Sequence, residues 1–404
     1  MKKIQADVVI VGTGVAGLFC ALNIDPRKKV IMVTKKEADK SDSYLAQGGV
    51  CVLKKESDFN SYYEDTMRAG HYENNGCAVK VMIRQSPEVI DDIIGYGVEF
   101  HRSQDGKLMY TKEGAHSHSR ILFHEDITGK EITTKLLAAV RKCPNVQILE
   151  QFCMVDLITQ NNRCFGIVGT DNESELTAVY AANTVLASGG VGGLYQNSTN
   201  FRHITADAVA IAILHGIQVQ NINYVQIHPT TLYSQKEGRR FLISESVRGE
   251  GAKLYNAAGE RFVDELLPRD LLTQEIYKQM KKDQKPYVWL DMRPIGEKTI
   301  REHFPNIYER CLEEGYDPLQ QPIPVVPAQH YFMGGIKANL DAKTTMKNLF
   351  AVGETACNGV HGKNRLASNS LLESLVFSKR AAHVINDDDA EAQMVPVDDA
   401  PYQD

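Results

Sequence analysis

The sequence predicts an α/β fold in which a second domain interrupts the first. Residues 6–11, ADVVIV, form a continuous valine-rich run, as expected for a strand covered on both faces. Two later apolar runs lead into glycine and indicate further strands, in TVLASGG (184–190) and NLFAVGE (348–354). Residues from about 220 to 330 differ in composition, because they hold many of the prolines and several turns rich in basic and acidic residues.

The chain length also favours two domains. At 404 residues the chain exceeds the roughly 250–300 residues at which a single core stops growing. The final stretch, INDDDAEAQMVPVDDAPYQD, is acidic and is expected to be a solvated, mobile end. The expected division is a discontinuous first domain at 1–219 and 331–385, an inserted capping domain at 220–330, and an acidic flexible tail at 386–404.

Composition excludes several classes of function. The net charge is −6 and no block of basic residues occurs, which argues against nucleic-acid binding and against a polybasic membrane patch. No apolar run approaches the ~20 residues of a membrane span, and the start, MKKIQADVVIVGTG, leads into a glycine motif rather than a cleavage site. The eight cysteines form no C-x-x-C pair, so we expect no metal site and a reducing, cytoplasmic location.

A glycine motif follows the first strand directly. Gly12, Gly14 and Gly17 form G-x-G-x-x-G in GTGVAG, before the apolar helix that opens with LFCALNI. The first glycine permits a tight turn, the second admits a pyrophosphate close to the backbone, and the third lets helix and strand pack. The helix N-terminus then offers free N–H groups to the phosphates. The motif in this context predicts a Rossmann-like dinucleotide-binding domain.

The next strand, KVIMVTKK (29–36), departs from the usual NAD pattern. It ends in Thr34, Lys35 and Lys36, where an acid usually holds the ribose hydroxyls. Glu37 lies too far beyond the strand for that role, so ordinary NAD binding is not expected.

Three further segments indicate a flavin instead. AQGGV (46–50) would let the backbone approach a flat ring closely. Glu354, in VGE at the end of a strand, would accept a hydrogen bond from a ribose hydroxyl. SNSLLESLVFSKRAA (368–382) predicts an amphipathic helix whose N-terminus would stabilise negative charge on a reduced flavin. Each segment alone is also compatible with ordinary turn or cap chemistry.

The order of the motifs resembles that of a known family. GTGVAG, AQGG, QIHPT, SVRGEG, PRD, HYFMGG, VGE and NRLASNSLLES are similar to the flavoproteins of the succinate dehydrogenase, fumarate reductase and L-aspartate oxidase family, over residues 6 to 385. The resemblance implies a Rossmann-like FAD-binding domain with an inserted α+β capping domain. The family's C-terminal helical domain is expected to be absent, because the chain stops soon after Ile385.

The resemblance also implies the residues that hold FAD. They are Gly12, Thr13, Gly14, Val15, Ala16, Gly17, Lys35, Ser43, Ala46, Gln47, Gly48, Gly49, Asp207, Glu354, Ser370 and Leu371. Members in membrane complexes attach the flavin through a histidine four residues before the AQGG-like motif. Asp42 occupies that position here, so the flavin is expected to be bound non-covalently.

The family acts on four-carbon dicarboxylates, so the resemblance implies donors for two carboxylates. These are Arg365, His330, His228, Gln226, Ser244 and Ser368. Arg269 matches the family's proton-transfer arginine, and Glu245 and Arg248 match a relay from it to solvent, with His228 beside them. Arginine normally stays protonated and is a poor isolated base. From the residues alone, surface ion pairing of the two arginines is the alternative.

Glu113 lies in TKEGAHSHSR (111–120), which by itself reads as an exposed loop. Reductases of the family have an apolar aromatic at this point, whereas an acid would pair with a substrate ammonium. The resemblance therefore implies a substrate that carries an amine. His116 and Ser117 are expected to shape the same pocket, and His118 is expected to face solvent.

The function implied is oxidation of L-aspartate to iminoaspartate by hydride transfer to FAD, with reoxidation by O2, giving H2O2, or by fumarate. The product would enter NAD biosynthesis through quinolinate, with quinolinate synthase as the next enzyme. No nucleic-acid or membrane partner is expected. The nearest alternative is a soluble fumarate reductase or succinate-oxidising flavoprotein. An electron-transfer subunit docked on an iron–sulfur protein would need the flavin-linking histidine, which this chain lacks. A flavin-binding protein without catalysis also stays open.

Overall fold

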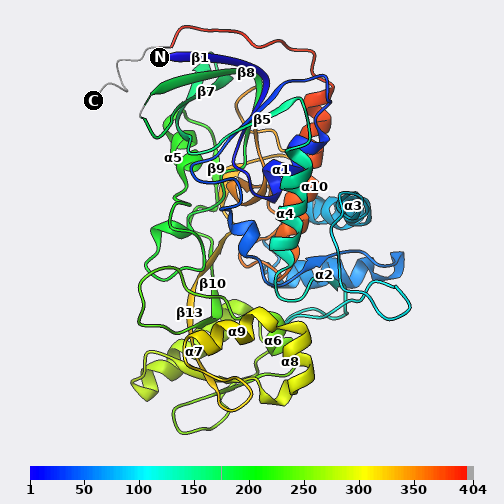
Figure 1. The fold of residues 1–404 in the computed structure, drawn as a ribbon, viewed down its shortest axis with the longest axis vertical. Helices are drawn as coiled ribbons and strands as arrows, with labels where there is room; N and C mark the ends of the chain where they lie inside the picture. The colour runs from blue at the N-terminus through cyan, green and yellow to red at the C-terminus, as the bar shows by residue number, and fades with distance from the viewer. Residues whose placement is uncertain (174, 398–404) are drawn as a thin grey trace.

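The computed structural model describes residues 1–173 and 175–397. Figure 1 shows two bodies along the long axis, which the long strands β10 (Val225–Leu232) and β13 (Ile323–Phe332) connect. One body is built around a large, mainly parallel sheet, and the other around a small antiparallel sheet.

The large sheet has seven strands in the order β5-β2-β1-β8-β7-β6, with β15 paired to β8. Pairing is parallel among β5, β2, β1, β8 and β15, so the carboxyl ends of these strands meet at one edge. Strands β6 and β7 complete the sheet with antiparallel pairs. The strands are β1 (Lys2–Val11), β2 (Val30–Val33), β5 (Val146–Leu149), β6 (Cys153–Gln160), β7 (Arg163–Thr170), β8 (Leu176–Leu186) and β15 (Leu349–Ala351).

The central position of strand β1 in the sheet explains why its sequence is continuously apolar. Val8 and Ile10 pack into the cluster under the helices on one face, whereas Val9 and Val11 pack into the cluster on the opposite face. All four side chains are buried, because the strand is central and both faces of the sheet are covered.

Helices cover the two faces of the large sheet unequally (Figure 1). Helices α1, α4 and α10 pack together on one face, with α2 and α3 beyond α10. Helix α5 and a three-stranded sheet cover the other face. These elements are α1 (Val15–Asn23), α2 (Phe59–Ala69), α3 (Gly76–Gly95), α4 (Thr128–Val140), α5 (Asp207–Leu214), α10 (Asn369–Asn386), β9 (Val219–Gln220), β14 (Gly335–Lys337) and β16 (Ala356–Cys357).

The smaller body has its own apolar core, formed by residues between Leu232 and Val325. Its sheet has the order β10-β13-β12-β11 and is antiparallel throughout. Asp126 of the large body accepts backbone hydrogen bonds from Asn306 and Ile307 at the start of α9, at 3.3 and 2.6 Å. The remaining elements are β11 (Lys253–Tyr255), β12 (Val288–Asp291), α6 (Glu245–Gly249), α7 (Arg269–Asp283), α8 (Glu297–His303) and α9 (Pro305–Glu313).

Short elements complete the described chain. A two-stranded ribbon pairs β3 (Val50–Cys51) with β4 (Ile121–Leu122). Single turns of 3-10 helix occur at Asp42–Leu45, Glu56–Asp58, Gly192–Leu194, Arg293–Ile295 and Gly353–Thr355.

The expected strands and helices are present, although their bounds differ from those expected. The strand expected at 29–36 is limited to Val30–Val33, because its neighbour β1 turns away at Gly12, whose N–H donates to Val33 O at 2.9 Å. The domain boundaries at 219/220 and 330/331 stay a prediction; β13 continues past the second of them to Phe332.

The tail expected at 386–404 stays a prediction, although part of it contacts the large sheet. Residues that follow α10 lie along the sheet: Ala392 O accepts from Gln5 Nε2 at 3.0 Å, and Val395 O accepts from the Tyr180 hydroxyl at 3.1 Å. Val395 and Val397 pack on a buried cluster that contains Tyr180. These two valines give an otherwise acidic segment an apolar anchor. Residues 398–404 of the tail lie outside the described part of the chain.

Candidate active site

One long cavity runs from the β1–α1 turn to the smaller body. Most of the residues predicted for the cofactor and the substrate line it: Gly12, Thr13, Gly14, Ala16, Lys35, Ser43, Ala46, Gln47, Gly48, Gly49, Glu113, Asp207, His228, Ser244, Glu245, Arg269, His330, Glu354, Arg365, Ser368, Ser370 and Leu371. Four of the predicted residues do not line the cavity and can act only through neighbouring residues. They are Val15, Gly17, Gln226 and Arg248.

The turn at one end of the cavity fits a dinucleotide phosphate. Gly12 has φ +112°, and a Cβ there would meet Ala187 O at 2.1 Å, so only glycine fits. A Cβ on Gly17 would meet Gly12 O at 2.1 Å, which confirms close packing of helix on turn. Helix α1 has no side-chain cap at Gly14, so its N-terminus is open toward the cavity, although the Val15 N–H is held by Ser43 Oγ at 3.2 Å.

Buried polar atoms along the cavity wall also fit a large polar group. Ser41 Oγ, Asp42 Oδ2 and Gln47 Oε1 have no hydrogen-bond partner among the described residues. Burial raises the pKa of Asp42 to about 7 and the pKa of Glu354 to about 8. Both carboxyls would gain from hydrogen-bond donors that a cofactor brings, such as ribose hydroxyls.

Lys35 and Asp207 face each other across this half of the cavity. The two side chains form an ion pair, and Lys35 Nζ also donates to Thr205 Oγ1 at 2.9 Å. Lys35 thus stands where the usual NAD pattern has an acid at the end of the strand. Its charge is already paired with Asp207.

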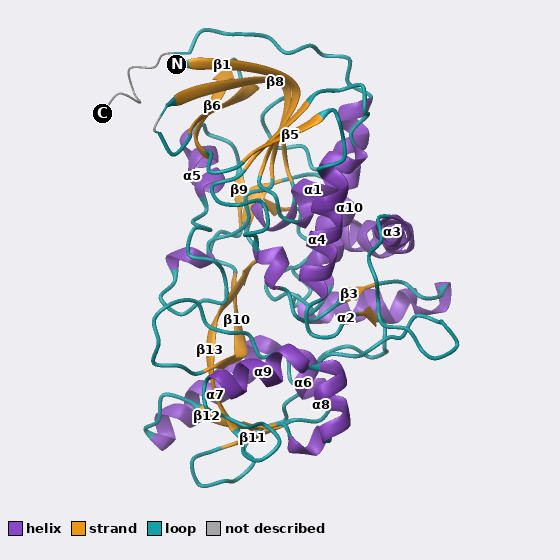
Figure 2. Ribbon diagram, in the orientation of Figure 1, coloured by secondary structure: helices purple, strands orange, loops and turns teal. Residues whose placement is uncertain are grey.

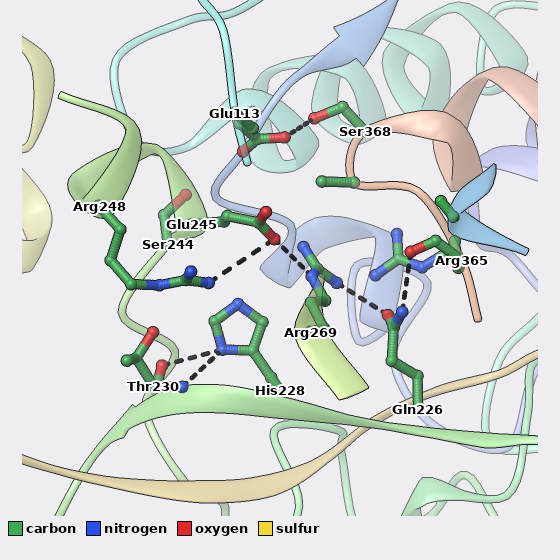
Figure 3. Close-up of polar contacts among 12 residues, drawn as sticks. Glu113, Gln226, His228, Thr230, Ser244, Glu245, Arg248, Arg269, Arg365 and Ser368 are labelled. Atoms are coloured by element: carbon green, nitrogen blue, oxygen red, sulfur yellow. Dashed lines mark hydrogen bonds and ion pairs between the residues drawn. The ribbon is translucent and has the colours of Figure 1, made fainter. Parts of the chain in front are cut away.

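The other end of the cavity carries cationic and imidazole groups (Figure 3). The Arg365 guanidinium lies 4.3 Å from the centroid of the Tyr331 ring, and its Nη1 donates to Ser370 Oγ at 2.6 Å. Burial, followed by the charge of Arg269, lowers the pKa of Arg365 to about 10, which leaves it protonated at neutral pH. Its Nε has no partner among the described residues, so a donor remains for a ligand.

Two neutral histidines lie beside this arginine. The rings of His228 and His330 are 5.1 Å apart, and burial holds the pKa of each well below its usual value. His228 Nδ1 lies 3.1 Å from Thr230 N and 3.0 Å from Thr230 O, so Thr230 fixes the orientation of the ring. The other ring nitrogen, Nε2, is buried and has no partner in the described part of the chain, so it is available to a ligand.

Arg269 is the centre of a buried hydrogen-bonded chain (Figure 3). Its Nε donates to Glu245 Oε2 at 2.5 Å, and its Nη1 donates to Gln226 Oε1 at 2.9 Å. Arg248 Nη2 lies 3.8 Å from the same Glu245 oxygen. Gln226 Nε2 in turn donates to Arg365 O at 2.8 Å. The alternative of surface ion pairing is therefore wrong for both arginines, since Arg248 and Arg269 are buried.

Glu113 is buried, so TKEGAHSHSR is not simply an exposed loop. Oε1 accepts from Ser246 Oγ at 2.8 Å and Oε2 accepts from Ser368 Oγ at 2.5 Å. Burial and then the nearby charge of Glu245 raise the pKa of Glu113. No ion pair forms on this carboxylate within the described residues, which sets it apart from Glu245.

Glycines let this segment approach its neighbours. A Cβ on Gly48 would meet Glu113 Oε1 at 2.8 Å, and a Cβ on Gly114 would meet Glu245 Oε1 at 2.5 Å. A Cβ on Gly249, at the end of α6, would meet Lys112 O at 2.7 Å. The Glu113 and Glu245 carboxylates can therefore lie close together, because the residues packed against them are glycines.

The expected pocket roles of His116 and Ser117 are wrong. His116 is buried behind the wall, with Nε2 3.1 Å from Ala367 O, and Ser117 is exposed and donates to Asp65 Oδ2 at 2.7 Å. Sequence reasoning missed Arg120, which pairs with Asp65 at 2.7 Å in a fully buried contact. This pair holds the Glu113 segment in place. His118 is exposed, as expected.

Comparison with known proteins identifies the family. The sequence profile of the FAD binding domain family matches residues 7–371. A protein of Clostridium perfringens named L-aspartate oxidase is 51% identical over 387 residues, which make up 96% of this chain and 88% of that protein. The chain belongs to the L-aspartate oxidase family.

Further relatives agree with this assignment. An L-aspartate oxidase of Clostridium acetobutylicum is 50% identical over 95% of this chain and 88% of its own length. Among solved structures, a quinol fumarate reductase of E. coli with one mutated residue superposes with a TM-score of 0.90, at 30% identity, over 96% of this chain and 71% of that one. The L-aspartate oxidase family and the reductases thus share this fold.

These comparisons confirm the predicted flavoprotein fold, FAD as the cofactor and the oxidoreductase class of this L-aspartate oxidase family member. Within residues 1–173 and 175–397, no helix is long and apolar enough to cross a membrane. In the same part of the chain, no group of three or more histidine, cysteine or acidic side chains is placed to hold a metal ion.

Proposed function

We propose that the chain oxidises L-aspartate to iminoaspartate, with the substrate between FAD and the smaller body. The observation that carries the proposal is a pair of charges without ionic partners in one cavity. Neither Glu113 nor Arg365 forms an ion pair within 4.0 Å in the described chain, whereas Arg269 is paired with Glu245. A ligand that carries both an ammonium and carboxylates would neutralise both groups, and aspartate has this charge pattern.

The carboxylates of the substrate would bind at the Arg365 end. The guanidinium lies over the Tyr331 ring and donates to Ser370 Oγ, so its free donors have a fixed direction. His228 Nε2 and the His330 ring would add neutral hydrogen-bonding groups beside it. Gln226, behind the wall, fixes the backbone at Arg365 and the side chain of Arg269 together. Ser244, which lines the cavity, offers a further hydroxyl.

The ammonium of the substrate would bind to Glu113. A charge-assisted hydrogen bond to a buried carboxylate is strong, and the same carboxylate would stay unpaired against an amine-free ligand. Fumarate and succinate carry no amine, so this site disfavours the alternative of a fumarate reductase or succinate-oxidising enzyme.

Oxidation of the C–N bond removes a hydride from Cα and a proton from nitrogen. FAD, when bound, supplies the hydride acceptor. The proton would pass through Arg269: transfer of its Nε proton to Glu245 Oε2, 2.5 Å away, leaves a neutral guanidine, which can then accept the proton from the substrate. Arg248, 3.8 Å from the same oxygen, continues the chain. An arginine can serve here only because Glu245 is held against it.

The cofactor is proposed to be non-covalent. Gly12, Gly17 and the open N-terminus of α1 suit the pyrophosphate, and Glu354 suits a ribose hydroxyl. Asp42, at the position of the linking histidine, offers no ring nitrogen for a covalent bond. We also propose that the imine, which is unstable in water, is consumed by quinolinate synthase on the way to NAD.

Purified protein loaded with FAD and supplied separately with aspartate and succinate in air tests the proposal. We expect hydrogen peroxide from aspartate and little or none from succinate. Turnover of succinate at an equal or higher rate would favour the alternative function. Absence of any product from aspartate, with oxygen or with fumarate as acceptor, would overturn the proposal.

A further inference from the structure

Ser246 lies behind the cavity wall and contacts Glu113 directly. Its Oγ donates to Glu113 Oε1 at 2.8 Å. We propose that Ser246 is a specificity-determining positioning residue, which directs Glu113 toward the substrate ammonium and so selects amine-bearing dicarboxylates. This inference rests on the proposed function, because it assumes that Glu113 binds an ammonium.

The hydrogen bonds around Glu113 have a defined direction. Ser244 Oγ donates to Ser246 Oγ at 3.3 Å, and the Gly49 N–H donates to Ser368 Oγ at 3.1 Å. Each of the two serine hydroxyls next to Glu113 therefore already accepts a hydrogen bond and turns its own proton toward the carboxylate. Glu113 has to accept on both oxygens, and a carboxyl group does this best when it is ionised.

The backbone of α6 places Ser246 at this point. Ser244 caps the helix by accepting from the Ser246 N–H at 3.3 Å. At the two ends of α6, Gly114 gives room to Glu245, and Gly249 packs directly on Lys112 O. The helix is thus fixed against the Glu113 segment on both sides, and Ser246 reaches the carboxylate from a rigid position.

Other charges around Glu113 act on it without a direct hydrogen bond. The titratable and charged groups that act on it are Glu245 and Arg248 on α6, Arg269 on α7, Arg365 before α10, and Cys51 on β3. Glu245 opposes ionisation of Glu113, whereas the charge of Arg269, which is itself paired with Glu245, favours it without a direct contact. The hydroxyls of Ser246 and Ser368 are the groups that favour the charged form through direct contact.

Ser246→Ala tests the proposal. Loss of a hydrogen bond to a charged group is expected to raise KM for aspartate roughly tenfold to hundredfold. Removal of the donor raises the pKa of Glu113, so the acidic limb of the pH profile of kcat/KM for aspartate moves to higher pH. Inhibition by succinate, which has no ammonium to bind, is expected to stay unchanged or to become stronger, because ionised Glu113 disfavours an amine-free ligand.

A direct readout does not depend on turnover. Titration of 13C-labelled glutamate carboxyls by NMR, with the Glu113 signal assigned from Glu113→Gln, should show its titration moved to higher pH in Ser246→Ala. Ser246→Thr, which keeps the hydroxyl, should restore both the signal and KM. Ser378→Ala is the matched control, since Ser378 is buried and its Oγ contacts only Leu375 O in α10, at 3.1 Å.

The outcomes separate the two proposals. If the unmodified enzyme does not oxidise aspartate, the proposed function fails. If it does, and Ser246→Ala leaves both the acidic limb and the Glu113 titration unchanged, the role of Ser246 is refuted. Equal weakening of aspartate and succinate in Ser246→Ala, without rescue by threonine, also overturns the inference, because it indicates general damage to the site.

Discussion

Ser368 Oγ donates a 2.5 Å hydrogen bond to Glu113 Oε2, although the two residues are 255 positions apart in the chain. Ser368 precedes α10 in a left-handed backbone conformation, with φ 62°, which turns its side chain back toward the cavity. Its hydroxyl also accepts from the Gly49 N–H in the predicted flavin-binding turn. The acid that we assign to the ammonium is thus fixed directly to the cofactor side of the cavity (Figure 3).

Glu113→Gln should separate aspartate from amine-free ligands. Glutamine fills the same volume but carries no charge, so the ammonium loses its partner while the fold is kept. Such a loss at a buried charge pair costs about 2–5 kcal/mol. We expect kcat/KM for aspartate to fall by the corresponding factor, roughly 30-fold to several thousandfold, as measured by peroxide release.

Succinate inhibition provides the control for that variant. It should be unchanged or stronger, because the buried charge that opposed an amine-free ligand is gone. Weaker binding of succinate together with aspartate would contradict a role in recognising the amine.

Gly114→Ala should break the proton relay without unfolding the protein. The new Cβ would meet Glu245 Oε1 at 2.5 Å, and the carboxylate has to move away from Arg269. A loss of about 100-fold in kcat is expected, as for removal of a proton-transfer group. Gly95→Ala in α3 is the matched control, since a Cβ there meets nothing within 4 Å. Equal kcat in the two variants would argue against a relay through Glu245.

FAD should leave the protein on acid precipitation. Asp42 lines the cavity and accepts from the Phe201 N–H at 2.8 Å, and it has no ring nitrogen that could bond to a flavin. All the yellow colour is therefore expected in the supernatant after precipitation of the holoenzyme. Colour that stays with the denatured chain would show a covalent link that the sequence does not suggest.

Acid should destabilise the fold through buried histidines. Burial lowers the pKa of His361 from the ordinary value of 6.5 to about 3. A depressed folded-state pKa gives stability that is fully present above the unfolded value and is lost as pH falls from about 6.5 toward 3. The free energy of unfolding, measured by urea with FAD in excess, should fall by up to about 1.4 kcal/mol per pH unit from this group.

Two substitutions check the origin of that slope. His361→Gln should flatten it, because glutamine does not titrate. His118→Gln, at an exposed position, should leave the slope unchanged. A slope that is the same in both variants would place the acid sensitivity elsewhere.

Much of the cofactor half could be predicted because its signals are local. The spacing of Gly12, Gly14 and Gly17 specifies a turn within six residues. The continuous apolar sequence of β1 predicts that both of its faces are buried, as they are. Glu113 could be singled out by its residue type once a family with dicarboxylate substrates was recognised. These inferences needed no knowledge of distant contacts.

The missed features depend on contacts between distant segments. Arg120 and Asp65 are 55 positions apart, and the sequence around neither residue indicates a buried ion pair. Ser246 meets Glu113 across 133 positions, through a helix of five residues whose placement depends on glycines in another segment. Ser117 does not reach the pocket, because the turn at Ala115, with φ 64°, directs it to Asp65 instead.

The position of the substrate nitrogen is the most direct test of the account. The enzyme with its FAD already reduced cannot oxidise aspartate, so crystals of that form can be soaked with the substrate. We predict that the ammonium lies within about 3.2 Å of a Glu113 oxygen, with a carboxylate on Arg365. An ammonium far from Glu113, with that carboxyl still bonded only to Ser246 and Ser368, would contradict it.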